Sequence, residues 1–193
     1  VKMEDQVTDL ALESASTADE PLFQGLLGPA FGSLPTRVRH LHLQNGLAVY
    51  SGEVEVERGT GLLSRLCGWA TRLPPSGRGP VTVHIDADGR GETWVRHMGG
   101  HAMPSRLRAA DGLLCERLGL VTFGFRITVE RGCLVWRVVR VRALGLPLPS
   151  WMFAGVAARE SEEAGRYLFD VSAALPFAGP LVRYRGWLHV DPD

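Results

Sequence analysis

The chain has 193 residues, 45% of them hydrophobic and 22% charged, which is long enough to bury the core of one globular domain. Its 21 Lys and Arg balance 21 Asp and Glu, and this net charge of zero gives no overall attraction to phosphate backbones, so we expect no nucleic-acid partner. Three cysteines, no visible signal peptide and no apolar run long enough to span a bilayer predict a cytoplasmic protein without disulfides or a membrane span.

The start of the chain differs in composition from the rest. Residues 1–19 are acidic and rich in Ser, Thr and Ala, which is typical of a disordered tail, and we expect a single β-rich domain over residues 20–190. Apolar residues at helical spacing predict a short helix from Leu22 to Ala30, and residues 36–43 predict another helical turn. Residues 47–58 alternate apolar and acidic side chains, so they predict the first strand.

A second amphipathic helix is predicted after this strand, ending near Leu73. Its apolar stripe is formed by Leu62, Leu63, Leu66, Trp69 and Ala70, and we expect this stripe to pack on the sheet. Pro74 and Pro75 end the helix. The two short N-terminal helices, one before and one after the first strand, could plug the mouth of a barrel or cover an open side of a sheet.

From residue 80 onward the sequence alternates between strand patterns and turns. The clearest case is residues 121–141, where two apolar runs around Arg131 and Gly132 predict a long antiparallel hairpin. Residues 146–149 predict a rigid loop. The expected strands cover residues 47–58, 81–86, 92–98, 103–109, 113–118, 121–130, 134–141, 156–162, 166–175 and 181–190. About ten strands predict a mainly β fold, an antiparallel β-barrel or strongly curved sheet, because so wide a sheet rarely stays flat.

Several motifs are similar to those of one bacterial family. They are Glu92–Arg96, Ser105, Leu113–Glu116, Phe123–Phe125, Leu146–Pro149, Phe169-Asp170 and the closing run Gly179–Leu188. From about Leu22 to Leu188 the chain resembles the family of domain of unknown function 4166, although it has Met98 and Met103 where that pattern has Phe. The resemblance implies no reaction and no catalytic residues. Family members also occur behind a saccharopine-dehydrogenase-like domain, which implies a separate dehydrogenase as a candidate partner.

Three charged residues are the candidates for catalysis: Arg96, Glu116 and Asp170. Glu92 and Arg96 share one strand face with Trp94 but lie roughly 13 Å apart along the strand, so each needs a partner on another strand. One interpretation is a polar cluster with a Trp platform that orients a ligand's carboxylate, carbonyl or hydroxyl. The other is a solvated sheet face or a structural ion pair that fixes strand register.

Further candidates would bind a ligand by lining an apolar pocket. They are Glu92, Trp94, Met98, Met103, Arg126, Trp136, Tyr184 and Trp187. No spacing typical of a zinc, calcium, dinucleotide or P-loop site accompanies them, and the acidic strip Glu53, Glu55 and Glu57 is more typical of a solvent-facing strand. We therefore expect no metal and no cofactor.

These features predict a protein that binds a hydrophobic small molecule in a β-barrel-like cavity. Two functions stay open: a cofactor-independent cyclase or isomerase of specialised metabolism, and a non-catalytic lipid-like ligand-binding or accessory module that partners a separate dehydrogenase. A homo-oligomer is a further candidate assembly. A pocket above about 300 Å³, lined by aromatic residues and by Glu92, Arg96, Glu116 or Asp170, would favour ligand binding, whereas a filled core would favour a structural or docking domain.

Overall fold

The chain forms eleven strands and five helical segments over residues 20–191, the residues that this computed structural model describes. The strands are β1 (Gly46–Arg58), β2 (Gly77–Asp88), β3 (Gly91–Met98), β4 (His101–Ala110), β5 (Leu113–Leu118), β6 (Val121–Glu130), β7 (Cys133–Ala143), β8 (Leu146–Leu148), β9 (Ala157–Glu163), β10 (Arg166–Leu175) and β11 (Gly179–Leu188). The helical segments are α2 (Leu22–Leu27), η1 (Gly28–Ser33), α3 (Thr36–His42), α4 (Leu62–Ala70) and η2 (Ser150–Phe153), where η marks a 3-10 helix. The tail expected over residues 1–19 lies outside the described residues.

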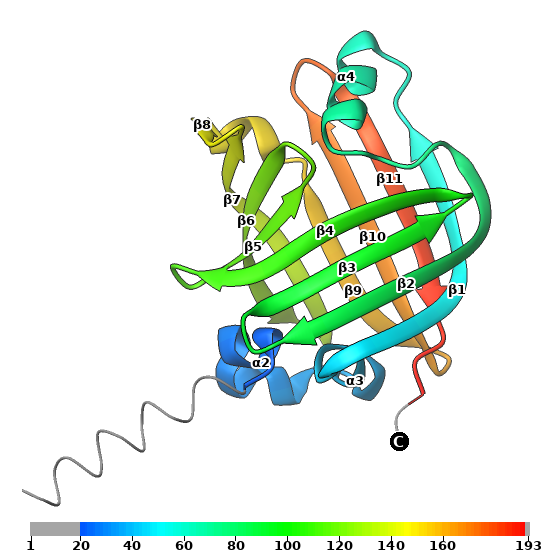
Figure 1. The fold of residues 1–193 in the computed structure, drawn as a ribbon, viewed down its shortest axis with the longest axis vertical. Helices are drawn as coiled ribbons and strands as arrows, with labels where there is room; N and C mark the ends of the chain where they lie inside the picture. The colour runs from blue at the N-terminus through cyan, green and yellow to red at the C-terminus, as the bar shows by residue number, and fades with distance from the viewer. Residues whose placement is uncertain (1–19, 192–193) are drawn as a thin grey trace, which may run out of the picture.

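Ten of the strands close into an antiparallel β-barrel (Figure 1). Around the ring the order is β6-β5-β4-β3-β2-β1-β11-β10-β9-β7, and the pairing of β6 with β7 closes it. The short strand β8 pairs with β7 beside the ring. The predicted mainly β fold, with about ten antiparallel strands in a barrel, is therefore confirmed.

The inner face of the barrel follows from the alternation in the sequence. In β3, the side chains of Trp94, Arg96 and Met98 are buried, whereas Thr93 and His97 on the other face are exposed. Successive residues of a strand point to opposite faces of the sheet. Alternate residues therefore face the interior except where the β6–β7 and β10–β11 pairings shift register, and the inward apolar side chains form one core.

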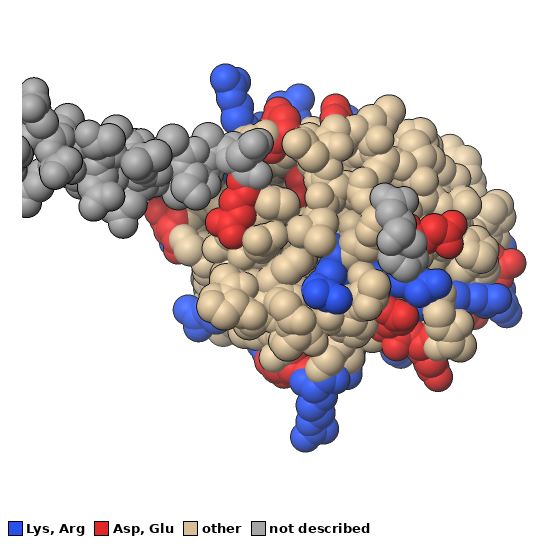
Figure 2. Space-filling view, turned by 90° about the horizontal axis from the view of Figure 1, so that it is seen from below, with Lys and Arg blue, Asp and Glu red and all other residues tan. Residues whose placement is uncertain are grey.

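One end of the barrel, which we call the floor, is closed by α2, η1 and α3 (Figure 1). Seen from below, this end carries uncharged atoms across its middle and charged side chains mostly toward its edges (Figure 2). The floor buries the apolar side chains Phe23, Phe31, Val38 and Leu41. The helix predicted up to Ala30 ends at Leu27, because Gly28 takes a left-handed φ of 54° and the chain continues as a 3-10 helix.

The opposite end, which we call the mouth, is crossed by α4 (Figure 1). At the start of this helix the Ser64 hydroxyl donates to the carbonyl of Leu181 in β11 at 3.3 Å. At its end the carbonyl of Ala70 accepts a hydrogen bond from the amide of Leu120, between β5 and β6, at 3.1 Å. The Arg58 guanidinium donates to two carbonyls of the segment after the helix, at 3.2 and 3.1 Å. These contacts fix α4 across the opening.

The prediction that the apolar stripe of α4 packs on the sheet is wrong for three of its five residues, whereas Ala70 is half-buried and lines the barrel interior. Leu62, Leu66 and Trp69 are 83%, 61% and 72% exposed. The helix instead turns the small residues Ser64 and Gly68 toward the barrel, where both are buried. A side chain at Gly68 would displace the guanidinium of Arg58, because a Cβ added there would overlap that group, which binds the segment after the helix.

Three of the four residues in the rigid loop predicted over 146–149 instead form the short strand β8. β8 pairs with Val141–Ala143 of β7, and Pro147 lies opposite Arg142. A proline cannot donate to a sheet ladder, so it is tolerated on such an edge strand. In the described range no helix is long and apolar enough to cross a membrane.

Candidate functional site

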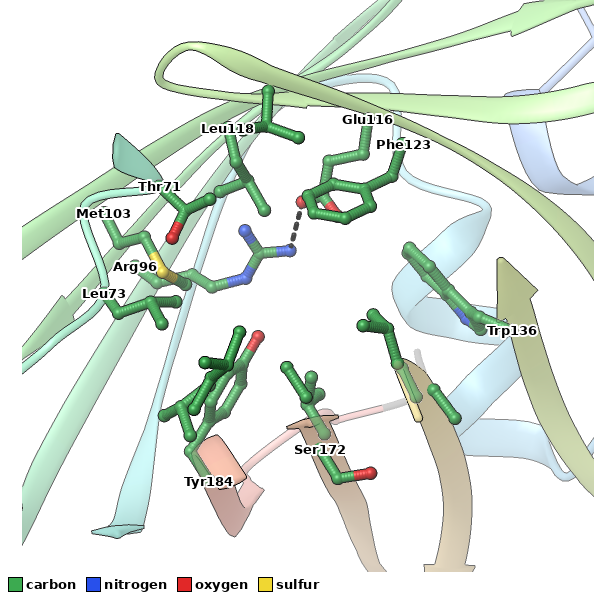
Figure 3. Close-up of a pocket in the computed structure, with 18 of the residues that line it drawn as sticks. Thr71, Leu73, Arg96, Met103, Glu116, Leu118, Phe123, Trp136, Ser172 and Tyr184 are labelled. Atoms are coloured by element: carbon green, nitrogen blue, oxygen red, sulfur yellow. Dashed lines mark hydrogen bonds and ion pairs between the residues drawn. The ribbon is translucent and has the colours of Figure 1, made fainter. Parts of the chain in front are cut away.

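The inner faces of the strands surround a chamber of about 420 Å³ below α4 (Figure 3). Its wall is almost wholly apolar, and the strands contribute Val81, Val83, Met98, Met103, Leu118, Phe123, Phe125, Trp136, Ala158, Phe169, Val171, Val182 and Leu188 to it. Leu66 of α4 lines the chamber and is also largely exposed, so the chamber reaches the surface at the mouth. Sites for small molecules have volumes of roughly 300–1,000 Å³, and this chamber falls within that range.

An ion pair lies on this apolar wall. Arg96 of β3 donates through Nη2 to Oε1 of Glu116 in β5 at 3.2 Å (Figure 3). It also donates through Nη1 to the hydroxyl of Ser105 in β4 at 2.9 Å. Its guanidinium carbon lies 4.7 Å from the ring centre of Trp94, a cation–π contact. Both members of the pair are buried. Three neighbouring strands thus fix the position and orientation of one charged guanidinium group inside the chamber.

Tyr184 of β11 is a second polar group on the wall, and Figure 3 shows its hydroxyl pointing into the chamber. Burial raises the pKa of Tyr184 to about 12, and the carboxylates of Glu116 and Glu160 add to this shift against the opposing charge of Arg96. The phenol therefore keeps its proton at neutral pH and is available as a hydrogen-bond donor. Burial alone would lower the pKa of Arg96, but Glu116 and the phenols raise it, so the guanidinium stays charged.

A second buried pair lies between the chamber and the floor. His42 of α3 is fully buried, and its Nε2 lies 2.6 Å from Oε2 of Glu160 in β9, a residue of the chamber wall. The imidazole packs on the ring of Phe23, with 3.7 Å between ring centres. Tyr167 of β10 also lines the chamber, and burial together with the charge of Glu160 raises its pKa well above the ordinary value. A carboxylate, an imidazole and a phenol thus meet where the sequence predicted none.

Glu92 lies beside this pair. Its Oε2 accepts a hydrogen bond from the Trp94 indole at 2.6 Å. Burial raises the pKa of the Glu92 carboxyl group, and the charge of His42 opposes this increase. The indole that carries the cation–π contact is therefore fixed from behind by a carboxyl group.

One hydrogen-bond donor on the chamber wall has no partner. The Nε1 of Trp136 in β7 is buried and makes no hydrogen bond within the described part of the chain. Buried polar groups are almost always hydrogen-bonded, and an unpaired one costs about 1–3 kcal/mol. This nitrogen is closed off from the chamber, so the hydrogen-bond donors that a molecule in the chamber can reach are those of Arg96 and Tyr184. The arrangement can bind an apolar molecule that presents a carbonyl or carboxylate to these two residues.

The structure places seven of the predicted site residues on the chamber wall. These are Arg96, Glu116, Trp94, Met98, Met103, Trp136 and Tyr184. Glu92 is buried behind Trp94 and does not line the chamber.

Three other predicted site residues face away from the chamber. Asp170 pairs with Arg183 on the outer face at 2.7 Å, and Arg126 is exposed. Trp187 packs on the outer face against Arg166, whose guanidinium carbon lies 4.3 Å from the ring centre. None of the three can contact a molecule inside the barrel, so the predicted catalytic role of Asp170 has no geometric basis.

Sequence reasoning missed Glu160, Tyr167 and His42. The tyrosine shares its strand face with Phe169 and Val171, so period-two alternation was a usable signal for it. The other two had no such signal. The segment of β9 is mostly polar, and nothing in the short helix α3 marks one histidine as buried.

No group of three or more His, Cys, Asp or Glu in residues 20–191 lies close enough together to hold a metal ion. The acidic strip of β1 faces outward, where Glu55 pairs with Arg185 at 3.0 Å. The residues of the chamber thus offer charge, hydrogen-bond donors and apolar surface.

A family model described as a domain of unknown function, DUF4166, matches residues 34–188, which is most of the chain. No curated protein matches it. Among solved structures, a putative thioesterase II from Thermobifida fusca YX is 12% identical, with 81% of this chain and 84% of that chain covered. The TM-score of 0.23 is too low for this likeness to carry an argument.

Proposed function

The chain belongs to the DUF4166 family, whose description names no reaction. A function must therefore be inferred from the site itself, and we propose that the chain binds a hydrophobic small molecule in the barrel chamber. The observation that carries the proposal is the buried pair of Arg96 and Glu116 in an otherwise apolar chamber of about 420 Å³. Burying such a pair costs desolvation free energy, and apolar replacements are often neutral or stabilising. A role toward a ligand explains the pair better than stability does.

The polar groups define the class of ligand. Arg96 and Tyr184 present hydrogen-bond donors, and the rest of the wall is mostly aliphatic or aromatic. A molecule with an apolar body and a carbonyl or carboxylate oxygen fits this arrangement. Its oxygen would lie against the donors, and its body would fill the chamber toward α4.

The chemistry that suits these groups is a cofactor-independent cyclisation or isomerisation. A closed chamber holds a flexible substrate in one folded conformation, which removes entropy from the barrier. The guanidinium of Arg96 and the phenol of Tyr184 would stabilise negative charge that develops on the substrate carbonyl. The carboxylate of Glu160, oriented by His42, is the candidate base that takes a proton from the adjacent carbon and returns it elsewhere on the same molecule.

Binding can be tested with parinaric acid, a fluorescent polyunsaturated fatty acid that has an apolar body and one carboxylate. We expect its fluorescence to rise on binding and expect Ala158→Trp, which fills the chamber, to weaken the affinity at least about tenfold. The matched control is Ala102→Trp on the exposed face of β4, which should leave the affinity unchanged. Equal affinity of wild type and both variants would place the probe outside the chamber and contradict the proposal.

A second candidate is a binding module without catalysis, which carries a lipid-like molecule or serves a separate dehydrogenase. The observation that favours it is that both carboxylates on the wall already have partners, Arg96 for Glu116 and His42 for Glu160. Cyclisation and isomerisation conserve mass, so mass alone cannot separate the two candidates. Molecules bound by the protein should instead be recovered and compared with the starting material by NMR: a changed carbon skeleton or double-bond position indicates the enzyme, and unchanged molecules indicate the module.

A further inference from the structure

Large apolar side chains are exposed around the mouth. Eight of them lie at five places in the chain: Leu62, Leu66 and Trp69 on α4, Leu120 between β5 and β6, Leu144 and Leu146 around the β7–β8 turn, Trp151 on η2 and Phe177 between β10 and β11. Three further exposed apolar side chains, Leu43, Leu47 and Val49, lie on α3 and the start of β1 at the other end. Figure 1 places α4 and β8 at the same end of the barrel. Exposed apolar patches of this extent usually mark an interaction site.

The charges of the same region have one sign. We define the rim as residues 59–78, 117–122, 142–157 and 172–182, the segments that surround the mouth. It contains the exposed arginines Arg65, Arg72, Arg78, Arg117 and Arg142 and no Asp or Glu, although the whole chain carries equal numbers of acidic and basic residues. None of these five arginines forms an ion pair with another residue of the described range.

We propose that the rim docks on an anionic lipid surface, with its apolar side chains in the interfacial layer and its arginines against the lipid phosphates. Tryptophan and phenylalanine are suited to the membrane interface, and arginine can bury its aliphatic stem there while its charge meets phosphate. An interface between two copies of this chain would bring the unpaired arginines of both rims together, which disfavours a second copy as the partner.

The position of the chamber also favours lipid over an acidic protein. The chamber opens inside the rim, since Leu66 both lines it and is exposed. On a membrane, this opening would face the acyl chains, so an apolar ligand could pass between bilayer and chamber without crossing water. This passage of a ligand between bilayer and chamber rests on the proposed ligand binding. The docking itself is inferred from the rim residues alone.

The test is sedimentation of the full chain with vesicles of phosphatidylcholine alone or with 30% phosphatidylglycerol. We expect binding to the anionic vesicles that weakens with salt. Trp69→Ser, Trp151→Ser and Phe177→Ser combined should lower binding at least about tenfold. Combined Arg65→Gln, Arg117→Gln and Arg142→Gln should lower it about a hundredfold, from about fivefold per arginine. The control, Leu47→Ser with Val49→Ser, removes equally exposed apolar side chains from the far end and should bind like wild type.

Several results would overturn the proposal. These are no binding of the wild-type chain to anionic vesicles, equal binding to neutral vesicles, and an equal loss in the far-end control. A dimer that the rim variants dissociate, without any vesicle binding, would identify a second copy as the partner instead. Failure of the docking and failure of the proposed ligand binding can be told apart. The rim variants should still bind parinaric acid in vesicle-free buffer, and Ala158→Trp should still bind vesicles.

Discussion

Arg96 and Glu116 show how single residues set the properties of the chamber. Each is buried and hydrogen-bonded to the other, and the arginine also holds Ser105. Removing one partner leaves the other charge buried and unpaired, whereas removing both leaves an apolar wall. The folded chain is therefore stable when both charges are present or both are removed, and it is destabilised when only one of them remains.

A double-mutant cycle tests this coupling. Arg96→Met alone should lower the free energy of unfolding by about 3–5 kcal/mol, because Glu116 keeps a buried charge without a partner. Arg96→Met with Glu116→Leu should recover most of that loss, since both charges are gone. Urea unfolding of the four proteins measures the cycle, and additive losses would show that the two side chains do not interact in solution.

Tyr184 predicts a dependence of stability on pH. Its pKa in the folded chain is about 12, above the value of about 10 for free tyrosine. A raised pKa means that the folded state holds the proton more tightly, so the stabilisation is complete below pH 10 and is lost as pH rises toward 12. Between those two pH values, ionisation of this residue lowers the free energy of unfolding by roughly 3 kcal/mol.

The variant Tyr184→Phe has no phenol to ionise, so its free energy of unfolding should fall less between pH 9 and pH 11 than that of wild type. Urea unfolding at a series of pH values gives the comparison. Tyr50 also has a pKa of about 12 and remains in both proteins, so part of the decline should persist in the variant. Identical pH profiles would mean that Tyr184 is not buried as described.

At the scale of elements, α4 is the part of the barrel whose attachment depends on few contacts. It is bound to the barrel by hydrogen bonds at its two ends and by the Arg58 guanidinium beneath it. Its apolar stripe adds little to this attachment, because Leu62, Leu66 and Trp69 are largely exposed. The helix is therefore the element most able to open the mouth.

Replacing Arg58 with Gln should loosen α4 without unfolding the barrel. We expect hydrogen–deuterium exchange to quicken at least about tenfold over residues 62–75 while the strands exchange as in wild type. Arg65→Gln, which removes an exposed arginine of the same helix, is the control and should leave exchange unchanged. Uniformly faster exchange would mean that the arginine stabilises the whole barrel and not the helix alone.

Local patterns predicted the elements better than they predicted their neighbours. Alternation located nearly every barrel strand because a period of two is a direct consequence of one buried face. The same alternation, applied to β10, places Asp170 on the other face of the strand from Phe169 and Val171, and so outside the barrel. In α4 the pattern was read correctly as amphipathic, but an apolar stripe does not say whether it faces the sheet, solvent or a partner. His42 and Glu160 meet across 118 residues of sequence, a contact that no local pattern encodes.

At the scale of the whole molecule, floor and mouth give the barrel two different ends. The floor is packed with buried apolar side chains, whereas the mouth exposes such side chains and carries unpaired arginines. The chamber between them is closed on one side and reaches the surface on the other. This polarity is what the two proposals share, since the ligand would enter where the lipid surface would lie.

The pairing of β1 with β11 has a consequence for how the chain folds. Around the rest of the ring each strand pairs with one that is next to it or separated only by β8 in sequence, whereas this pair joins residues such as Glu55 and Arg185. Local hairpins form in microseconds, but a contact of such sequence separation requires closure of a very long loop. During synthesis, most of the sheet could therefore assemble while the chain is still emerging from the ribosome. The chamber itself would come into existence only after the last strand has been released.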